Sequence, residues 1–385
     1  MSWKDQFELA DAVYLNGANH GPFPRVASAA VEEALSWKRD PSTIDDAIYF
    51  ALPDRVRRAA APFFGCRPQD LAITTGASTG VALLAAGIDW RPGDHVVVPE
   101  GEFPANYLPW RALQAKGVEL TLVPVERGEG GKRGDRGVAV ERIADALRPT
   151  TRVVAVGYVN FASGFRLDVE GIGALCAERD IAFLIDASQG AGAVPLDVRR
   201  SRATIVTAAG YKWMLSPYGT GVFYVDPEWV ERLPVPVVNW TSVVGAEDFN
   251  NLTTLELDYR PGAVRWDAPE TASFLNCMPM AASLEFLGDI GIERIFAHAL
   301  ALIDRVVAGL PEGFRADSSL QAEHRSTIFR IVGDDPQRTR AAYQRCVAAG
   351  ISVSLREGGI RVSPGVWNTA ADIDRLLEEL SLGHR

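Results

Sequence analysis

Short apolar runs, separated by amphipathic and polar stretches, recur along the first 225 residues of the chain. Seven of these runs are apolar at nearly every position: 71–75, 95–99, 119–123, 153–157, 182–186, 203–207 and 221–225. Such runs predict strands that are covered on both faces, which is typical of a mainly parallel sheet between helices. The segment 170–179 has its apolar residues on one helical face and leads into the strand 182–186. This alternation predicts a layered α/β domain.

The pattern changes in the C-terminal third of the chain. Long helical patterns at 278–290, 292–310 and 337–349 surround short strand patterns at 327–332, 351–355 and 360–363. This mixture predicts a smaller α+β domain. We therefore expect a large domain with the N-terminal segment over residues 1–255 and a small domain over 256–385.

One glycine-rich segment, 127–137, has five glycines and no apolar residue. It differs from a phosphate-binding P-loop because Lys132 is followed by arginine rather than serine or threonine. We expect a solvated surface loop there.

Composition excludes several classes of protein. Hydrophobic residues make up 47% and charged residues 23% of the 385 residues, which is the balance of a folded globular chain. The net charge of −10 argues against a nucleic-acid or membrane-surface binder. No run approaches the length of a membrane span. Residues 1–6 lack the pattern of a signal peptide, so we expect a cytoplasmic protein.

The four cysteines lie far apart and form no CxxC pair. The spacing therefore suggests neither a zinc site nor a disulfide framework, and we expect scattered reduced thiols and no bound metal.

Three segments carry residues that fit one kind of chemistry. In 72–84 a strand enters a turn of small, hydroxylated residues and then an apolar helix, which is a suitable anion site although helix capping alone explains it equally well. Asp186 ends a buried strand, where α/β sheets gather ligands, and a turn-capping role is the alternative. Lys212 lies between aromatic residues before a glycine-rich turn, a setting in which a lysine loses proton affinity and becomes a nucleophile.

Together these segments match the requirements of pyridoxal 5'-phosphate (PLP). That cofactor needs its phosphate held, its ring nitrogen kept protonated by a carboxylate and its aldehyde linked to a lysine. Asp186 precedes Lys212 by 26 residues (212 − 186), enough for one strand–helix–strand passage that returns the chain to the same edge of the sheet.

With these segments the sequence resembles the class V aminotransferases, which are fold-type I PLP enzymes and include cysteine desulfurases, kynureninases and isopenicillin N epimerase-like proteins. The resemblance extends from Tyr14 to Thr369 and is strongest over 156–225. It implies a homodimer that binds PLP and acts on a small amino acid or amine, with a large mainly parallel domain and a smaller α+β domain.

The resemblance also implies roles for individual residues. Lys212 matches the lysine that forms a Schiff base with PLP, and Asp186 matches the partner of the ring nitrogen. Further positions match cofactor contacts: Ala77 and Ser78 at the phosphate turn, Phe103 stacked on the ring, Asn160 beside the cofactor, Gln189 at the phenolic oxygen and Tyr211 before the lysine. Phe103 and Tyr211 stand where many relatives have histidines. Because a phenyl ring cannot shuttle protons, Phe103 can stack on the cofactor ring but cannot transfer a proton. The alternative is that Phe103 is a core residue.

Substrate contacts are implied at three positions. Arg361 matches the arginine that grips the substrate carboxylate, a task suited to a planar guanidinium, with an ordinary surface arginine as the alternative. Asn16 and His20, in an N-terminal turn, either face the substrate or cap that turn. Pro269 and Glu270 replace a Gly-Thr pair of the desulfurases, which leaves open whether this segment reaches the site of a partner subunit.

The residues that match the family indicate the cofactor more directly than they indicate the type of reaction. Desulfurases need a loop with a nucleophilic cysteine shortly before the arginine, whereas here 351–361 passes almost directly from a strand to Arg361. Cys346 lies upstream in a helical pattern, where a packed thiol is the default. We therefore disfavour a desulfurase and expect an aminotransferase, with a lyase, a kynureninase-type hydrolase or an epimerase as alternatives.

Two other classes are less consistent with these residues. A nicotinamide oxidoreductase needs a glycine fingerprint that 76–80 lacks. A non-catalytic scaffold would not need Lys212, Asp186 and Gln189 together.

Overall fold

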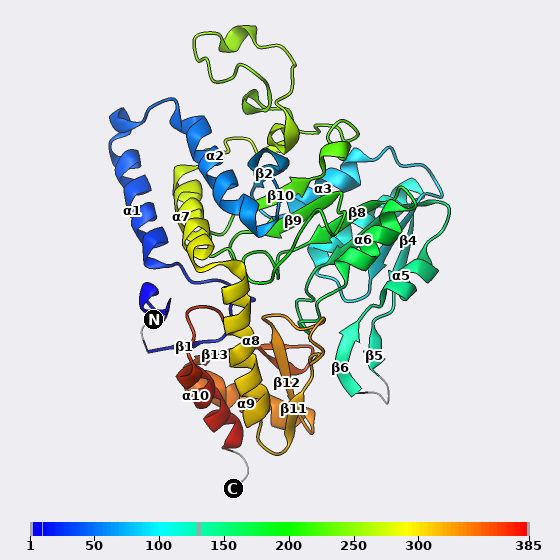
Figure 1. The fold of residues 1–385 in the computed structure, drawn as a ribbon, viewed down its shortest axis with the longest axis vertical. Helices are drawn as coiled ribbons and strands as arrows, with labels where there is room; N and C mark the ends of the chain where they lie inside the picture. The colour runs from blue at the N-terminus through cyan, green and yellow to red at the C-terminus, as the bar shows by residue number, and fades with distance from the viewer. Residues whose placement is uncertain (1–2, 10, 129–131, 383–385) are drawn as a thin grey trace.

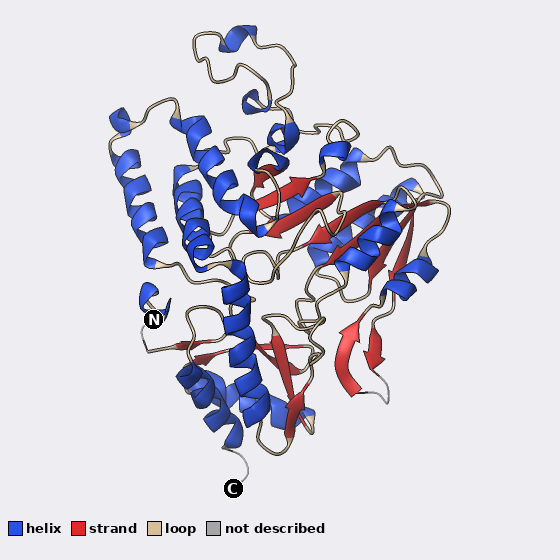
Figure 2. Ribbon diagram, in the orientation of Figure 1, coloured by secondary structure: helices blue, strands red, loops and turns tan. Residues whose placement is uncertain are grey.

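A seven-stranded sheet forms the centre of the computed structural model, which describes residues 3–9, 11–128 and 132–382 (Figures 1 and 2). Its strand order is β2-β10-β9-β8-β7-β3-β4, and β10 runs antiparallel to both of its neighbours while the other pairs are parallel. The strands are β2 (Leu71–Thr74), β3 (His95–Pro99), β4 (Glu119–Val123), β7 (Thr151–Gly157), β8 (Ala182–Asp186), β9 (Ile205–Ala209) and β10 (Gly221–Val225). The mainly parallel α/β sheet is thereby confirmed.

Helices cover both faces of this sheet. One apolar cluster joins the sheet to α1 (Arg25–Arg39), α2 (Ile48–Ala60), α5 (Val140–Ala146), α6 (Val169–Ala177) and α7 (Phe274–Ile290). A second cluster joins the opposite face to α3 (Ala77–Gly87) and α4 (Leu108–Ala112). Along β7, Val154 and Val156 belong to the first cluster, and Val153 and Ala155 to the second. Because successive side chains of a strand point to opposite faces, both sets must be apolar, which explains the continuous apolar runs.

The C-terminal third forms a four-stranded antiparallel sheet of order β11-β12-β15-β14, with its own apolar cluster. Its strands are β11 (Phe314–Ala316), β12 (Phe329–Gly333), β14 (Ser354–Arg356) and β15 (Gly359–Val362), and its helices are α8 (Ile292–Gly309), α9 (Pro336–Ala348) and α10 (Ala370–Ser381). The N-terminal strand β1 (Val13–Tyr14) pairs in parallel with β13 (Ile351–Ser352), so the start of the chain lies beside this sheet. The division at residue 255 stays a prediction.

The structure corrects two local expectations. The segment 127–137 is not a loop, because β5 (Glu126–Gly128) and β6 (Lys132–Gly137) pair as an antiparallel ribbon; 129–131 lie outside the described residues. Backbone hydrogen bonds are enough to hold two such strands together, and they need no apolar side chains. The apolar pattern of the sequence therefore gave no sign of this ribbon. Between β8 and β9, residues 187–204 form turns rather than the expected helix.

None of the helices among the described residues combines the length and the apolarity that a membrane crossing requires.

Candidate active site

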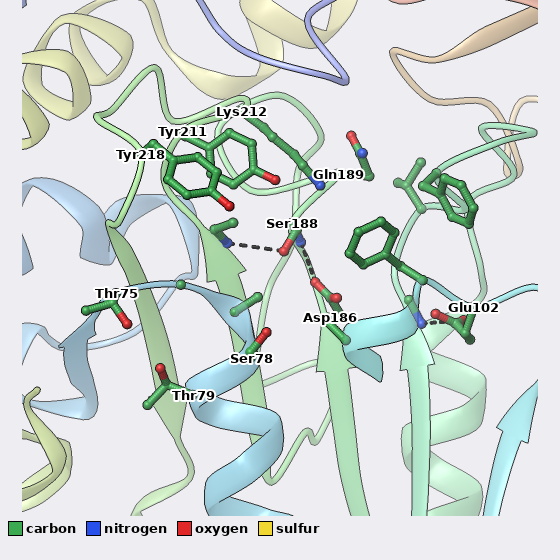
Figure 3. A pocket seen from close by; sticks show the side chains of 18 of the residues that line it. Thr75, Ser78, Thr79, Glu102, Asp186, Ser188, Gln189, Tyr211, Lys212 and Tyr218 are labelled. Carbon is green, nitrogen blue, oxygen red and sulfur yellow. Dashed lines mark hydrogen bonds between the residues drawn. The ribbon is translucent and has the colours of Figure 1, made fainter. Parts of the chain in front are cut away.

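A cavity of about 320 Å³ lies at the edge where the parallel strands of the large sheet end (Figure 3). Its walls come from the segments that follow β2, β3, β7, β8 and β9, and from the residues just before the antiparallel β10. The carboxyl ends of parallel strands are where α/β sheets bind ligands. The cavity therefore collects residues that are more than 100 positions apart in the sequence.

The start of α3 forms one end of the cavity. The helix begins at Ala77, and backbone N–H groups in a first turn have no partner within the helix. The Thr207 hydroxyl on β9 donates a hydrogen bond of 2.8 Å to the Ala77 carbonyl oxygen. A Cβ atom on Gly80 would lie 2.7 Å from the Thr207 side chain, so glycine allows this close approach. Ala77 and Ser78 both line the cavity, at the positive end of the helix dipole.

Asp186 ends β8 and is 8% exposed. Its Oδ1 accepts a hydrogen bond of 2.9 Å from the backbone N–H of Ser188, and the Ser188 hydroxyl accepts one from the N–H of Ala209 on β9. Figure 3 shows the carboxylate at the floor of the cavity. Asp186 therefore caps its turn and also faces the cavity. The turn-capping role and a contact with a ligand are thus compatible with each other.

Lys212 is 7% exposed and its amine lies between aromatic rings. Nζ is 5.4 Å from the centre of the Phe103 ring and 5.6 Å from that of Tyr211. Burial lowers the pKa of the Lys212 ammonium, the Asp186 charge opposes this shift, and the Arg361 charge adds to it. The lowered pKa favours the neutral amine, which is the nucleophilic form.

Gln189 is held between two elements. Its Nε2 donates to the Ala18 carbonyl at 3.0 Å, and its Oε1 accepts a hydrogen bond of 2.9 Å from Trp213 Nε1. The amide group is thereby fixed in the cavity wall, and Nε2 keeps its second hydrogen for a ligand oxygen.

Four of the proposed site residues do not line this cavity. Asn160 Oδ1 accepts hydrogen bonds from the N–H groups of 162 and 163, and Asn16 Oδ1 accepts one from the Ser354 hydroxyl. His20 lies beside the Tyr211 ring, with 4.8 Å between ring centres. Arg361, 2% exposed, donates from Nη1 to the Phe161 carbonyl oxygen at 2.6 Å. The ligand roles of these residues stay predictions, as does the role of Glu270, which is exposed.

The structure adds residues that sequence reasoning missed, chiefly Glu102, Phe161 and Tyr218. The Glu102 carboxylate accepts hydrogen bonds from the Gly157 N–H at 2.7 Å and from Asn106 Nδ2 at 3.2 Å. Burial raises its pKa to about 7, against the effect of the Gly157 hydrogen bond. The position of Glu102, three residues after the end of β3 and directly before Phe103, was the signal that the sequence offered.

A buried lysine, a strand-end carboxylate and a helix N-terminus around one cavity define a PLP-dependent enzyme of fold type I. The sequence profile of the family described as aminotransferase class-V matches residues 49–376, and the chain belongs to this family. A protein from Methanothermobacter thermautotrophicus named probable cysteine desulfurase is 28% identical, over 97% of this chain and 94% of its own length. A probable cysteine desulfurase from Streptomyces coelicolor is also 28% identical, over 96% and 91%.

Solved structures show the same fold. A lysine-to-alanine variant of C-DES, with glycine covalently linked to its PLP, superposes with a TM-score of 0.87 at 22% identity, over 98% of this chain and 99% of that one. The complex of the cystine C–S lyase C-DES with cysteine persulfide gives 0.85 at 22%, over 97% and 98%. The cofactor follows from membership of the aminotransferase class-V family, whose enzymes depend on PLP. The cavity suits it, because Lys212 can hold its aldehyde, Asp186 its ring nitrogen and the start of α3 its phosphate.

Proposed function

We propose that this protein is a PLP-dependent aminotransferase that acts on a small amino acid. The observation that carries the proposal is that Lys212 is the one amine among the described residues lining the cavity, where it faces Asp186. When bound, PLP supplies an aldehyde for the substrate amine and a ring that withdraws electrons from the bonds of the substrate Cα. Lys212 would take a proton from Cα and return it nearby on the same side, which is all that transamination asks of the protein.

The neighbours of Lys212 favour transamination over racemisation. Racemisation needs a second acid or base on the opposite side of Cα. Phe103 and Phe161, whose ring centres are 5.5 Å apart, line the cavity and carry no exchangeable proton. The Tyr211 ring lies on the Lys212 side of the cavity, with 5.6 Å between its centre and Lys212 Nζ.

Arg361 is the proposed partner of the substrate carboxylate. Burial, with a smaller contribution from Arg356, lowers its pKa to about 10, so the guanidinium stays charged at neutral pH. Its Nε has no hydrogen-bond partner among the described residues. A substrate carboxylate would satisfy this buried donor, which supports the assignment.

A persulfide route on an enzyme thiol has no support among the described residues. None of the four cysteines lines the cavity, and β14 reaches β15 through a two-residue turn at 357–358 with no room for a cysteine loop. Burial raises the pKa of Cys66, Cys176 and Cys277 to about 12 and that of Cys346 to about 11, so no thiolate forms at neutral pH. Cys346 belongs to the apolar cluster of the small sheet.

The names of the relatives favour a second candidate. Several are called probable cysteine desulfurases, and the structural neighbour C-DES is a cystine C–S lyase. The second candidate is therefore β-elimination from a sulfur-containing amino acid, in which the sulfur leaves on a small molecule rather than on the enzyme.

Product analysis separates the two candidates. The PLP-loaded protein is incubated with each amino acid, including cysteine and cystine, with and without a keto acid acceptor, and keto acid, ammonia and sulfide are measured. Transamination forms a keto acid only when the acceptor is present and releases no ammonia. Elimination forms pyruvate and ammonia without an acceptor, and that result would refute transamination. Chromatography on a calibrated column tests the expected homodimer in the same preparation.

A further inference from the structure

One wall of the active-site cavity is apolar. It consists of residues from the segments that follow β3 and β7, namely Phe103, Ala105, Val159 and Phe161. The Phe103 and Phe161 rings meet edge to face, with 5.5 Å between their centres and 78° between their planes. Phe103 is 43% exposed, so the surrounding protein leaves much of its ring uncovered. Apolar surface that stays open inside a cavity is available to a ligand.

The charged groups of the cavity do not serve this wall. Lys212 and Asp186 are assigned to the cofactor, and Lys212 is the one cation among the described lining residues. Glu102, which Figure 3 places far from the start of α3, turns both oxygens to protein donors. Its Oε1 accepts from the Gly157 N–H at 2.7 Å, and its Oε2 accepts from Asn106 Nδ2 at 3.2 Å. A charged substrate side chain would therefore find no free partner at the apolar wall.

Contacts with the small sheet and its loops fix the position of Phe161. Arg361 on β15 donates from Nη1 to the Phe161 carbonyl oxygen at 2.6 Å. Farther along the same segment, the Gly164 carbonyl oxygen accepts a hydrogen bond of 2.6 Å from the Ser326 hydroxyl. A Cβ atom on Gly164 would lie 2.1 Å from the Ile328 carbonyl oxygen, so glycine allows this close approach. Phe161 is thereby held beside the guanidinium proposed to bind the substrate carboxylate.

The substrate side chain is the group left to meet the apolar wall. On the proposed function, on which this inference rests, the substrate amine points to Lys212 and the carboxylate to Arg361. We propose that the side chain packs against Phe103 and Phe161, and that the substrate is an aliphatic amino acid of the size of valine or leucine. The cavity of about 320 Å³ also has to hold the cofactor, so the space for this side chain is small.

Polar amino acids of the same shape measure this preference. Threonine has nearly the shape of valine, and asparagine nearly that of leucine, so each pair differs in polarity and hardly in size. A hydroxyl or amide group packed against phenyl rings loses its hydrogen bonds with water. An apolar pocket therefore rejects such a polar isostere by about tenfold to a hundredfold.

The test uses the PLP-loaded full-length protein. Each of the four amino acids is titrated, and dissociation constants are taken from the initial change in absorbance of the bound cofactor. Formation of keto acid with an acceptor is measured in parallel. Phe161→Leu and Phe161→Asn form a matched pair, because the two replacements also have nearly the same size and differ in polarity. The wild-type comparison does not depend on the folding of any variant.

We expect the wild type to bind valine at least about tenfold more tightly than threonine, and leucine at least about tenfold more tightly than asparagine. The leucine-to-asparagine ratio should be at least about tenfold lower in Phe161→Asn than in Phe161→Leu. Equal binding within either pair by the wild type, no binding of valine and leucine, or the same ratio in both variants would overturn the proposal. Tight valine and leucine binding without acceptor-dependent keto acid would refute transamination and still support the apolar site, because the binding constants do not depend on the reaction.

Discussion

Glu102 should make the stability of this protein depend on pH in a way that one substitution removes. Its pKa is raised from 4.5 to about 7, chiefly by burial. In the folded chain the carboxyl therefore holds its proton up to about pH 7, whereas in the unfolded chain it loses it near 4.5. The folded state binds the proton more tightly, so the free energy of unfolding falls as the pH rises from about 4.5 to 7.

The size of this loss follows from the two pKa values. Their difference of about 2.5 corresponds to roughly 3 kcal/mol, since one pKa unit is about 1.4 kcal/mol. Asp267, whose pKa burial raises to about 6, adds a loss of the same sign over part of this range. A comparison of the wild type with Glu102→Gln at each pH cancels that contribution, because both proteins contain Asp267.

Urea denaturation from pH 4.5 to 8 measures the effect. Glu102→Gln stays neutral and keeps an oxygen that can accept from the Gly157 N–H. Its stability relative to the wild type should therefore rise with pH and level off above about pH 8, by up to roughly 3 kcal/mol. Glu100→Gln, a substitution of an exposed carboxylate two residues earlier, is the matched control and should show no such trend. A difference between Glu102→Gln and wild type that does not vary with pH would refute the argument.

Further predictions concern single side chains. Borohydride reduction followed by mass spectrometry should place the cofactor on the peptide that contains Lys212, and Lys212→Ala should keep the fold but lose the label; a label on another lysine would refute the assignment. Asp186→Asn removes the negative charge proposed to face the ring nitrogen, so turnover should fall by orders of magnitude while some PLP stays bound. Near-normal turnover would mean that Asp186 serves only to cap its turn through the hydrogen bond from the Ser188 N–H. Cys346→Ser should leave any sulfide release from cysteine unchanged and cost about 1–3 kcal/mol of stability, because it buries a hydroxyl; loss of a robust desulfurase activity would contradict the proposed route. Arg361→Ala should raise KM for amino acids more than for amines without a carboxylate, and equal effects on both would remove its proposed role.

Local patterns were sufficient for most of the architecture. The runs 182–186 and 221–225 coincide with β8 and β10, because a strand buried on both faces is apolar at nearly every position. The run 119–123 coincides with β4, which lies at the edge of the sheet and is partly exposed. The ribbon of β5 and β6 was missed because it has no apolar face to produce a pattern. The turns between β8 and β9 were missed because a parallel connection is usually a helix, and here apolar residues such as Ala191 and Val194 pack in the core without forming one.

The sequence by itself determined the parallel sheet, the family resemblance and the lysine and aspartate around which the site is built. Each of these depends on residues close together in the chain. Only the tertiary structure decided which side chains share the cavity. Glu102 and Tyr218 line it, whereas Asn16 and Asn160 hydrogen-bond elsewhere and Arg361 is buried and donates to the Phe161 carbonyl oxygen. The physical reason is that sheet pairing and packing bring distant segments together, and a side chain's direction and burial depend on neighbours that no local pattern contains.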